Sequence, residues 1–147
     1  MSWGDLVAAD PALAAHGRAR LHGRVSYLAT IRADGSPRVH PVTPDVTATA
    51  LYVFMEPTSP KGHDLRRYPR YALHGGVEDN EGGEGEFLVT GRATLVDDAT
   101  ERATAAAASP YQPVADRYIL FRLVVEHAMR TTYADGGPVR ERWDARD

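Results

Sequence analysis

The feature that most constrains the fold is the Asp34-Gly35 dipeptide, which separates two short runs rich in β-forming residues. Glycine adopts a positive φ without steric cost, so Asp-Gly between two such runs predicts a tight β-hairpin. The first strand is predicted over residues 25–32 and the returning strand over residues 37–42. Alternation places four apolar residues of the first strand on one side: Val25, Tyr27, Ala29 and Ile31.

The returning strand is bracketed by two prolines. Proline has no N–H to donate to a neighbouring strand, so Pro37 and Pro41 predict a sheet edge or a bulge, where backbone groups are free for a ligand. Side chains alternate along a strand, so Arg38 and His40 should share one face while Val39 lies on the other.

The rest of the chain adds strands that are mostly joined by hairpins, together with a few short helices. Strands are predicted near residues 47–55, 70–76, 86–96 (with a bend at Gly91) and 117–134, and 139–143 is a candidate for a short last strand. Helices are predicted at residues 3–22, 59–68 and 97–108. Six or seven antiparallel strands indicate a mainly β protein, a closed or split barrel, although periodicity alone does not separate a barrel from a sandwich.

The chain length of 147 residues predicts a single domain over residues 1–147. Within it we expect an N-terminal helix at 1–22, a barrel at 25–135 and a tail at 136–147. Residues 77–85 are acidic and rich in glycine, which predicts a mobile hairpin loop. This loop is either solvated or an active-site lid.

Composition excludes several classes of function. The chain has no cysteine, so it forms no disulfide, no iron–sulfur cluster and no thiol nucleophile, which fits a cytoplasmic protein. It has no apolar run of membrane-spanning length and no basic segment before an apolar one, so membrane insertion and secretion are not expected. Its net charge of −3 argues against nucleic acid as a partner.

Basic residues cluster in one short segment of this acidic protein. Ser59 is a candidate helix N-cap, and Lys61, Arg66, Arg67 and Arg70 follow it within twelve residues. Free N–H groups at a helix start favour an anion, and arginine and lysine add charge-assisted hydrogen bonds, as a phosphomonoester requires. Two interpretations remain: a phosphate site that Arg38 joins from the hairpin, or a helix cap with solvated basic residues.

Six histidines raise the question of a metal or haem site. None belongs to a His-Glu-x-x-His motif, and zinc sites that use cysteine are absent, so no metal is predicted. His40 and His74 could face a shared cleft, where either could serve as an axial haem ligand. The alternative is that both are ordinary pocket or surface histidines.

These segments, taken in order, resemble the pyridoxamine 5′-phosphate oxidase-like family of flavin-binding split β-barrels. The resemblance rests on residues 27–30, 34–42, 51–54, 59–61, 64–66, 69–74 and 86–93, and it covers roughly residues 20–135. It implies a homodimer with two FMN sites at the subunit interface. It also implies cofactor contacts from the returning strand, from the end of the next strand and from the Ser-x-Lys segment: Arg38, Val39, His40, Pro41, Phe54, Met55, Ser59 and Lys61.

The resemblance favours the phosphate-site interpretation and implies an FMN-dependent oxidoreductase that transfers hydride to or from an unidentified small molecule. No catalytic residue is assigned. The chain is shorter than the enzyme that names the family, and Trp143 only loosely matches that enzyme's C-terminal arginine–histidine segment, so the same substrate is not expected. The family also allows a deazaflavin (F-420) reductase, with Arg66, Arg67 and Arg70 receiving the cofactor's anionic tail, or a flavin- or haem-binding protein without turnover.

Overall fold

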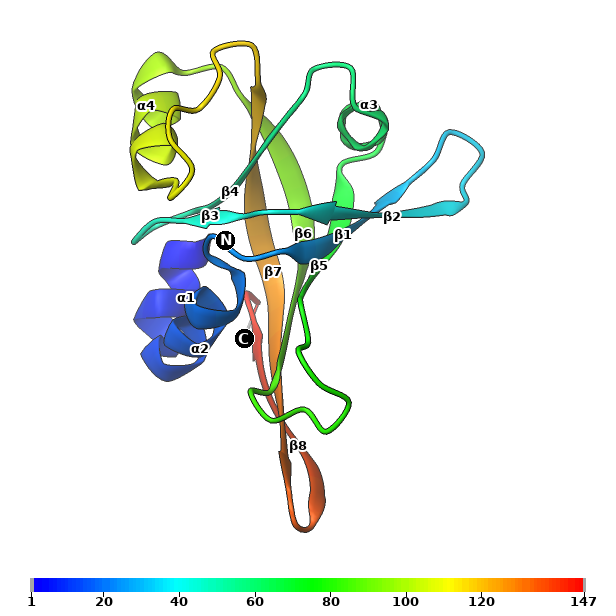
Figure 1. Ribbon diagram of the computed structural model, residues 1–147, viewed down its shortest axis with the longest axis vertical. Helices are drawn as coiled ribbons and strands as arrows, with labels where there is room; N and C mark the ends of the chain where they lie inside the picture. Colours follow the sequence, from blue (N-terminus) through cyan, green and yellow to red (C-terminus); the bar gives the residue numbers. More distant parts are fainter. Residues whose placement is uncertain (1, 147) are drawn as a thin grey trace.

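The computed structural model describes residues 2–146, which form one antiparallel sheet and four short helices (Figure 1). The two end residues of the predicted domain, 1 and 147, lie outside this range. The strands are β1 Ser26–Ile31, β2 Pro37–Val42, β3 Asp45–Val46, β4 Leu51–Met55, β5 Arg70–Gly75, β6 Glu86–Val96, β7 Ile119–Ala134 and β8 Gly137–Asp144. The helices are α1 Trp3–Ala9, α2 Pro11–Leu21, α3 Pro60–Arg67 and α4 Ala99–Ala108.

The order of the strands confirms a split barrel. Neighbouring strands follow the order β2-β1-β5-β6-β7-β4-β3, and β8 pairs with β7 outside this path. The two ends of the path, β2 and β3, are consecutive in the chain and are linked only by Thr43 and Pro44. A link this short holds the two edges near each other, although no strand hydrogen bonds join them.

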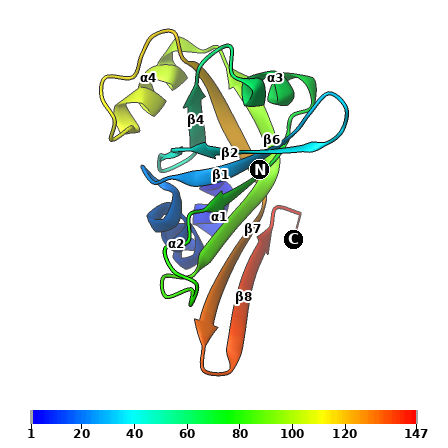
Figure 2. The same ribbon diagram turned by 45° about the vertical axis from the view of Figure 1, so that its right-hand side comes forward.

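The described sheet contains eight strands, whereas six or seven were predicted. The additional strand is the short β3, which precedes most of the strand predicted over residues 47–55 and pairs with Leu51 and Tyr52 of β4. The predicted tail at 136–147 is largely strand β8, which pairs with residues 127–134 of β7 (Figure 2). Both segments form local hairpins, with two residues between β7 and β8 and four residues between β3 and β4, and β8 agrees with the candidate strand at 139–143.

The predicted N-terminal helix is two helices. Asp10 ends α1 and caps α2 by accepting a hydrogen bond from the Leu13 N–H at 3.0 Å, and Pro11 occupies the first turn of α2. The helix count rises from three to four because of this break.

The hairpin that the sequence predicted is present. Gly35 has φ of 86°, and the Arg32 N–H donates to the Ser36 carbonyl at 2.8 Å across the turn. Among residues 2–146, strand β2 pairs only with β1, so it lies at the sheet edge as its prolines predicted. Its outer backbone groups are therefore free of strand pairing.

Gly91 marks a bulge in β6, where the register with β7 shifts between Thr90 and Gly91. A Cβ at this position would lie 1.9 Å from the Val124 carbonyl oxygen, which no real side chain could tolerate. The bend predicted at Gly91 is therefore confirmed, and it follows from close backbone approach.

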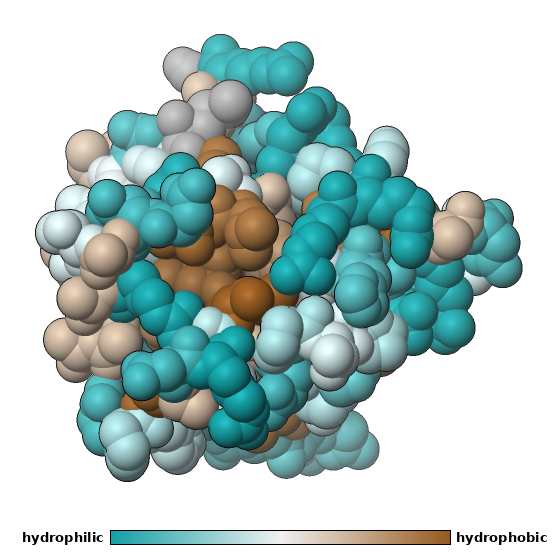
Figure 3. Space-filling view, turned by 90° about the horizontal axis from the view of Figure 1, so that it is seen from above, coloured by the Kyte–Doolittle hydropathy of each residue, from teal (hydrophilic) through white to brown (hydrophobic). Residues whose placement is uncertain are grey.

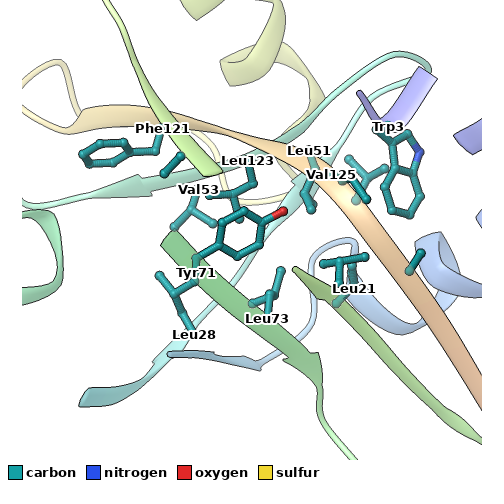
Figure 4. Packing of buried hydrophobic residues seen from close by; sticks show 14 of the residues in the cluster. Trp3, Leu21, Leu28, Leu51, Val53, Tyr71, Leu73, Phe121, Leu123 and Val125 are labelled. Carbon is teal, nitrogen blue, oxygen red and sulfur yellow. The ribbon is translucent and has the colours of Figure 1, made fainter. Parts of the chain in front are cut away.

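The core fills the concave side of the sheet and the space under α1 and α2. Tyr71 lies at its centre, surrounded by Val53, Leu73 and Leu123 (Figure 4). The Tyr71 hydroxyl donates to the Val124 carbonyl at 3.0 Å, and burial raises the pKa of this phenol. The long strand β7 runs through this core and offers one edge to β4 and then to β8.

Helices α3 and α4 lie at the same end of the molecule. Seen from that end, the surface shows an apolar recess between the regions over these helices, framed by hydrophilic side chains (Figure 3). None of the helices formed by residues 2–146 is both long enough and apolar enough to cross a membrane.

Candidate functional site

Strand β2 presents two different faces, as its alternation predicted. Val39 is opposite Ala29 of β1 and is 64% exposed, so it forms part of an uncovered apolar face. Arg38 is opposite Thr30, whose side chain is buried. Arg38 therefore turns toward the end of the molecule that carries α3, which lies beside the β1–β2 hairpin in Figures 1 and 2.

Asp64 of α3 holds Arg38 in place. Its Oδ2 accepts hydrogen bonds from Arg38 Nε at 2.7 Å and from the Thr30 hydroxyl at 2.8 Å. Its Oδ1 lies 3.6 Å from Arg67 Nη1. Burial opposes ionisation of this carboxyl, but the hydrogen bonds from Arg38 and Thr30 prevail and lower its pKa. Asp64 is thus a buried, ionised anchor for two arginines.

These groups line a cavity of about 480 Å³ that we call the cationic cavity. Its lining residues are Arg32, Ala33, Asp34, Arg38, Pro60, His63, Asp64 and Arg67. Among residues 2–146, the two Nη atoms of Arg38 have no hydrogen-bond partner, because only its Nε is bound. The cavity therefore has charged donors available to an anion, since three arginines outnumber its two carboxylates.

Ser59 and Lys61 lie on either side of Pro60. The Ser59 hydroxyl caps α3 by accepting from the Gly62 N–H at 3.3 Å, as the sequence predicted. Lys61 is half-buried, and burial lowers the pKa of its ammonium group. In the described part of the chain no carboxylate pairs with Lys61, so it is a further cation at the start of α3.

The other predicted basic residues separate. Arg70 donates to Glu126 Oε2 at 2.9 Å on the sheet, and Arg66 is exposed, with a weak contact to the Pro57 carbonyl at 3.4 Å. Only Arg67 of this group enters the cationic cavity.

Phe54 and Met55 have different surroundings. Met55 is 4% exposed and belongs to the core, so only its backbone can face a ligand. Phe54 points to the other face of β4, where the Arg102 guanidinium lies 5.3 Å from its ring centroid. Phe54 lines a second cavity and not the cationic one.

We call this second space, of about 450 Å³, the aromatic cavity. It lies between the end of the β2–β3 link, β4 and the segment after α4. Its lining residues are Thr43, Asp45, Phe54, Ser109, Pro110, Tyr111, Gln112, Pro113, Val114 and Tyr118. The eight predicted cofactor residues are thus spread over the edge strand and two neighbouring regions, and they share no single cavity.

The expectation that His40 and His74 face a shared cleft is wrong. His40 is opposite Leu28 and His74 is opposite Tyr27, and these consecutive β1 residues point to opposite faces. No group of three His, Asp or Glu side chains within residues 2–146 is arranged to hold a metal ion.

The loop at 77–85 is attached to α2. Arg20 is buried and binds the Glu84 carboxylate and the Gly76 carbonyl, while Arg24 binds Glu78. The cationic and aromatic cavities are lined by other segments. A role for this loop as a lid stays a prediction.

Sequence reasoning missed Thr30 and Asp64 as functional positions. Asp64 was seen only as part of a motif, and its burial between two arginines depends on how α3 packs against β1. The i, i+3 spacing of Asp64 and Arg67 on a predicted helix was a usable signal for their ion pair.

Comparison with protein families gives a match over residues 12–131 to the model described as pyridoxamine 5′-phosphate oxidase. A search of curated protein sequences finds no match to this chain.

Several solved structures are similar in fold. A protein of the NimC/NimA family from Clostridium acetobutylicum has a TM-score of 0.70 at 18% identity, covering 95% of this chain and 96% of that one. A haem-binding protein from Mycobacterium smegmatis has a TM-score of 0.69 at 20% identity and covers 89% of this chain, which spans 58% of that protein's length. An F-420 reductase has a TM-score of 0.59 at 18% identity, covering 76% of this chain and 94% of that one.

Proposed function

Because this chain belongs to the pyridoxamine 5′-phosphate oxidase family, we propose that it is an FMN-binding oxidoreductase acting on a small molecule. Bound FMN would supply a ring that accepts or delivers hydride. The observation that carries the proposal is the cationic cavity, which lies beside the free edge of β2.

The residues of the cationic cavity suit the phosphate of FMN. A phosphomonoester takes several charge-assisted hydrogen bonds at once, and Arg38 has two unused nitrogens fixed in direction by Asp64. Lys61 adds a compact charge at the start of α3, where backbone N–H groups also favour an anion. Asp64 acts as a positioning residue, because its carboxylate holds Arg38 and Arg67 through ion pairs.

Strand β2 suits the flavin ring. Its outer edge has no strand partner, and Pro41 donates no hydrogen bond, so the backbone between Val39 and Pro41 can face a planar ligand. The exposed Val39 and Pro41 side chains offer apolar contact. Phe54 and the Met55 backbone at the end of β4 would approach the ring from the neighbouring region.

We further propose a homodimer with cofactor sites at the interface. Tyr27 is opposite Pro41, and Ala29 is opposite Val39, so these four side chains share the uncovered face of β1 and β2. Tyr27 is 48% exposed and Val39 is 64% exposed. Exposed apolar side chains gathered on one face are typical of an interaction surface. Val39→Asp should shift the protein from dimer to monomer in light scattering, and an unchanged dimer would contradict this interface.

The first experiment is a titration of the purified protein with FMN, followed by its visible absorption. Lys61→Ala and Arg38→Ala should each weaken FMN binding about tenfold or more, because each removes a charge-assisted hydrogen bond. Lys61 is not part of the cavity lining but lies in the first turn of α3 next to Pro60, which is. Arg66→Ala is the matched control, since Arg66 is exposed, outside the cavity lining and in the last turn of α3. Equal affinity of all three variants would contradict the phosphate site.

Two other cofactors are tested alongside FMN. The cationic cavity holds three arginines, more than one phosphate requires, which would also suit the anionic tail of deazaflavin F-420. The similarity to an F-420 reductase and to a haem-binding protein supports including both compounds. Tighter binding of F-420 than of FMN would show that F-420 is the cofactor. A haem spectrum would favour a haem-binding protein without hydride transfer.

A further inference from the structure

The aromatic cavity contains a buried carboxyl group that lacks a full set of partners. Asp45 is 3% exposed and lines the cavity, and its Oδ1 has no hydrogen-bond partner among residues 2–146. A buried polar atom without a partner is costly, so proteins seldom retain one without a reason. Burial raises the pKa of Asp45 to about 6, although the neighbouring Ser109 hydroxyl opposes the rise.

The charged groups around Asp45 are already engaged with other atoms. Arg18 donates to the Val46 carbonyl at 2.5 Å, and His22 Nδ1 accepts from the Val46 N–H at 2.9 Å. Burial lowers the pKa of His22, and the nearby Arg18 lowers it further, so this imidazole is not a counter-ion. The hydroxyl of Tyr52, which is opposite Asp45 in the sheet, donates to Glu101 at 3.0 Å.

The remaining charges belong to the far wall. Glu101 also pairs with Arg122. Arg102 donates to the carbonyls of Tyr118, Ala115 and Asp116 at 2.6, 3.2 and 3.3 Å, so its charge is directed at the loop. Ser109 directly follows α4, whose C-terminal end carries partial negative charge toward the cavity. Arg102 and Arg117 lie 5.3 and 4.9 Å from the ring centroids of Phe54 and Tyr118, and Arg117 is paired with Glu56. The residues that line the aromatic cavity thus include a carboxylate and no cation.

The shape of the cavity adds a second requirement. Phe54, Tyr111 and Tyr118 supply aromatic surface, and the volume of about 450 Å³ is that of a site for a small molecule. Flat ligands stack on such rings, and cations gain further from them, although Phe54 and Tyr118 already carry the guanidinium groups of Arg102 and Arg117. Thr43 directly follows the strand assigned to the flavin ring, and Phe54 belongs to both regions.

We propose that the aromatic cavity binds a planar aromatic molecule carrying a positive charge or an N–H donor, which Asp45 receives, and that this molecule is the substrate. The second part rests on the proposed function, because it places the molecule beside the flavin ring. A phosphate ester is excluded from this cavity, because it would bring negative charge against Asp45. The aromatic cavity therefore prefers a cation, whereas the cationic cavity prefers an anion.

The test uses three compounds of nearly equal shape: benzamidine, which is cationic, benzamide, which is neutral, and benzoate, which is anionic. Calorimetric titration of the full chain at about pH 8 should give the highest affinity for benzamidine and at least a tenfold lower affinity for benzoate. Benzamidine affinity should fall about tenfold near pH 5, because Asp45 is then mostly protonated. Equal affinities for benzamidine and benzoate, or no binding of any compound, would overturn the proposal.

Asp45→Asn removes the charge and keeps the shape. It should weaken benzamidine binding about tenfold or more and change benzamide binding less than about twofold, because the amide oxygen still accepts a hydrogen bond. Asp135→Asn, in the exposed turn between β7 and β8, is the matched control. Loss of benzamidine and benzamide together would indicate a collapsed cavity and contradict a charge-based role.

Titration of the FMN-loaded protein separates this inference from the proposed function. Benzamidine should perturb the visible flavin spectrum if the two sites adjoin, and Asp45→Asn should bind FMN as the natural chain does. An unperturbed spectrum would overturn the placement beside the ring. If the protein binds benzamidine through Asp45 but binds no FMN, the proposed function fails, the substrate assignment falls with it, and the binding preference stands.

Discussion

Two buried aspartates, Asp64 against Arg38 near the start of β2 and Asp45 just beyond its end, show how strongly partners determine a carboxyl group's behaviour. Asp64 is 2% exposed and Asp45 is 3% exposed, so the two are buried alike. Arg38, Thr30 and Arg67 surround Asp64, and its pKa is lowered. Asp45 has Ser109 beside it and forms no ion pair within residues 2–146, and its pKa is raised to about 6.

The difference teaches that burial alone does not decide the charge of a site. The Asp64 carboxylate is fully committed to its arginines and makes the cationic cavity a place for an anion. The Asp45 carboxyl is uncommitted and leaves the aromatic cavity open to a cation. The same end of the protein thus carries two cavities that prefer ligands of opposite charge.

The largest expected effect comes from removing the Asp64 charge. Asp64→Asn should destabilise the protein by about 3–5 kcal/mol, because it leaves the Arg38 guanidinium partly buried without its counter-ion. The folded-state pKa of Asp64 is lowered, so the stabilisation is present above the unfolded value of 3.8 and is lost as the pH falls through the folded value. Urea unfolding at about pH 7 measures it, and a loss no greater than that of Asp135→Asn would break the comparison.

The same substitution at the other aspartate should act in the opposite direction. Asp45 has a raised folded-state pKa, so ionising it costs stability as the pH rises from 3.8 through about 6. Asp45→Asn should therefore stabilise the protein by up to about 3 kcal/mol at pH 8, and the gain should vanish below about pH 4. Thermal unfolding across this pH range measures the gain, and destabilisation at pH 8 would show that Asp45 has a partner in solution.

A smaller effect is expected from the wall of the aromatic cavity. Arg102 joins α4 to the segment at 115–118 through three carbonyls, which lysine cannot match with one compact group. Arg102→Lys should cost about 1–2 kcal/mol and loosen this segment. Amide hydrogen exchange should become faster at residues 109–118 and stay unchanged in the β1–β2 hairpin. An equal change in both regions would contradict a local role for Arg102.

The smallest effect on stability is expected at Arg67, which is exposed and 3.6 Å from Asp64. Arg67→Gln should change the unfolding free energy by less than about 1 kcal/mol, because exposed ion pairs contribute little. It should still weaken FMN binding more than Arg66→Gln does, since only Arg67 lines the cavity. Equal affinities of these two neighbouring variants would remove Arg67 from the phosphate site.

Much of the fold follows from local sequence. The Asp34-Gly35 hairpin, the edge position of β2, the bend at Gly91 and the cap at Ser59 each depend on the backbone chemistry of one or two residues. The pairings of β8 with β7 and of β3 with β4 are also local hairpins, but β3 contains only two residues, which is too short for a recognisable strand pattern. The break at Asp10 also depends on a local signal, a capping aspartate followed by proline, although one helix was predicted over residues 3–22.

The candidate site was predictable only in part. The cluster of basic residues predicts an anion site at the start of α3, and the family resemblance implies that Arg38 and Lys61 belong to it. Asp64 and Asp45 were missed because their importance lies in what surrounds them after folding. A sequence shows that an aspartate is present, and only packing shows whether an arginine or a serine lies against it.

The link of two residues between β2 and β3 limits how chains of this kind can vary in length. One added residue reverses the faces of all residues that follow in a strand. An insertion at Thr43 or Pro44 would therefore turn Asp45 away from the aromatic cavity or break its register with Tyr52. Related chains should gain and lose residues in the loop at 77–85 and in the β7–β8 turn, while the spacing between Arg38 and Asp45 stays constant.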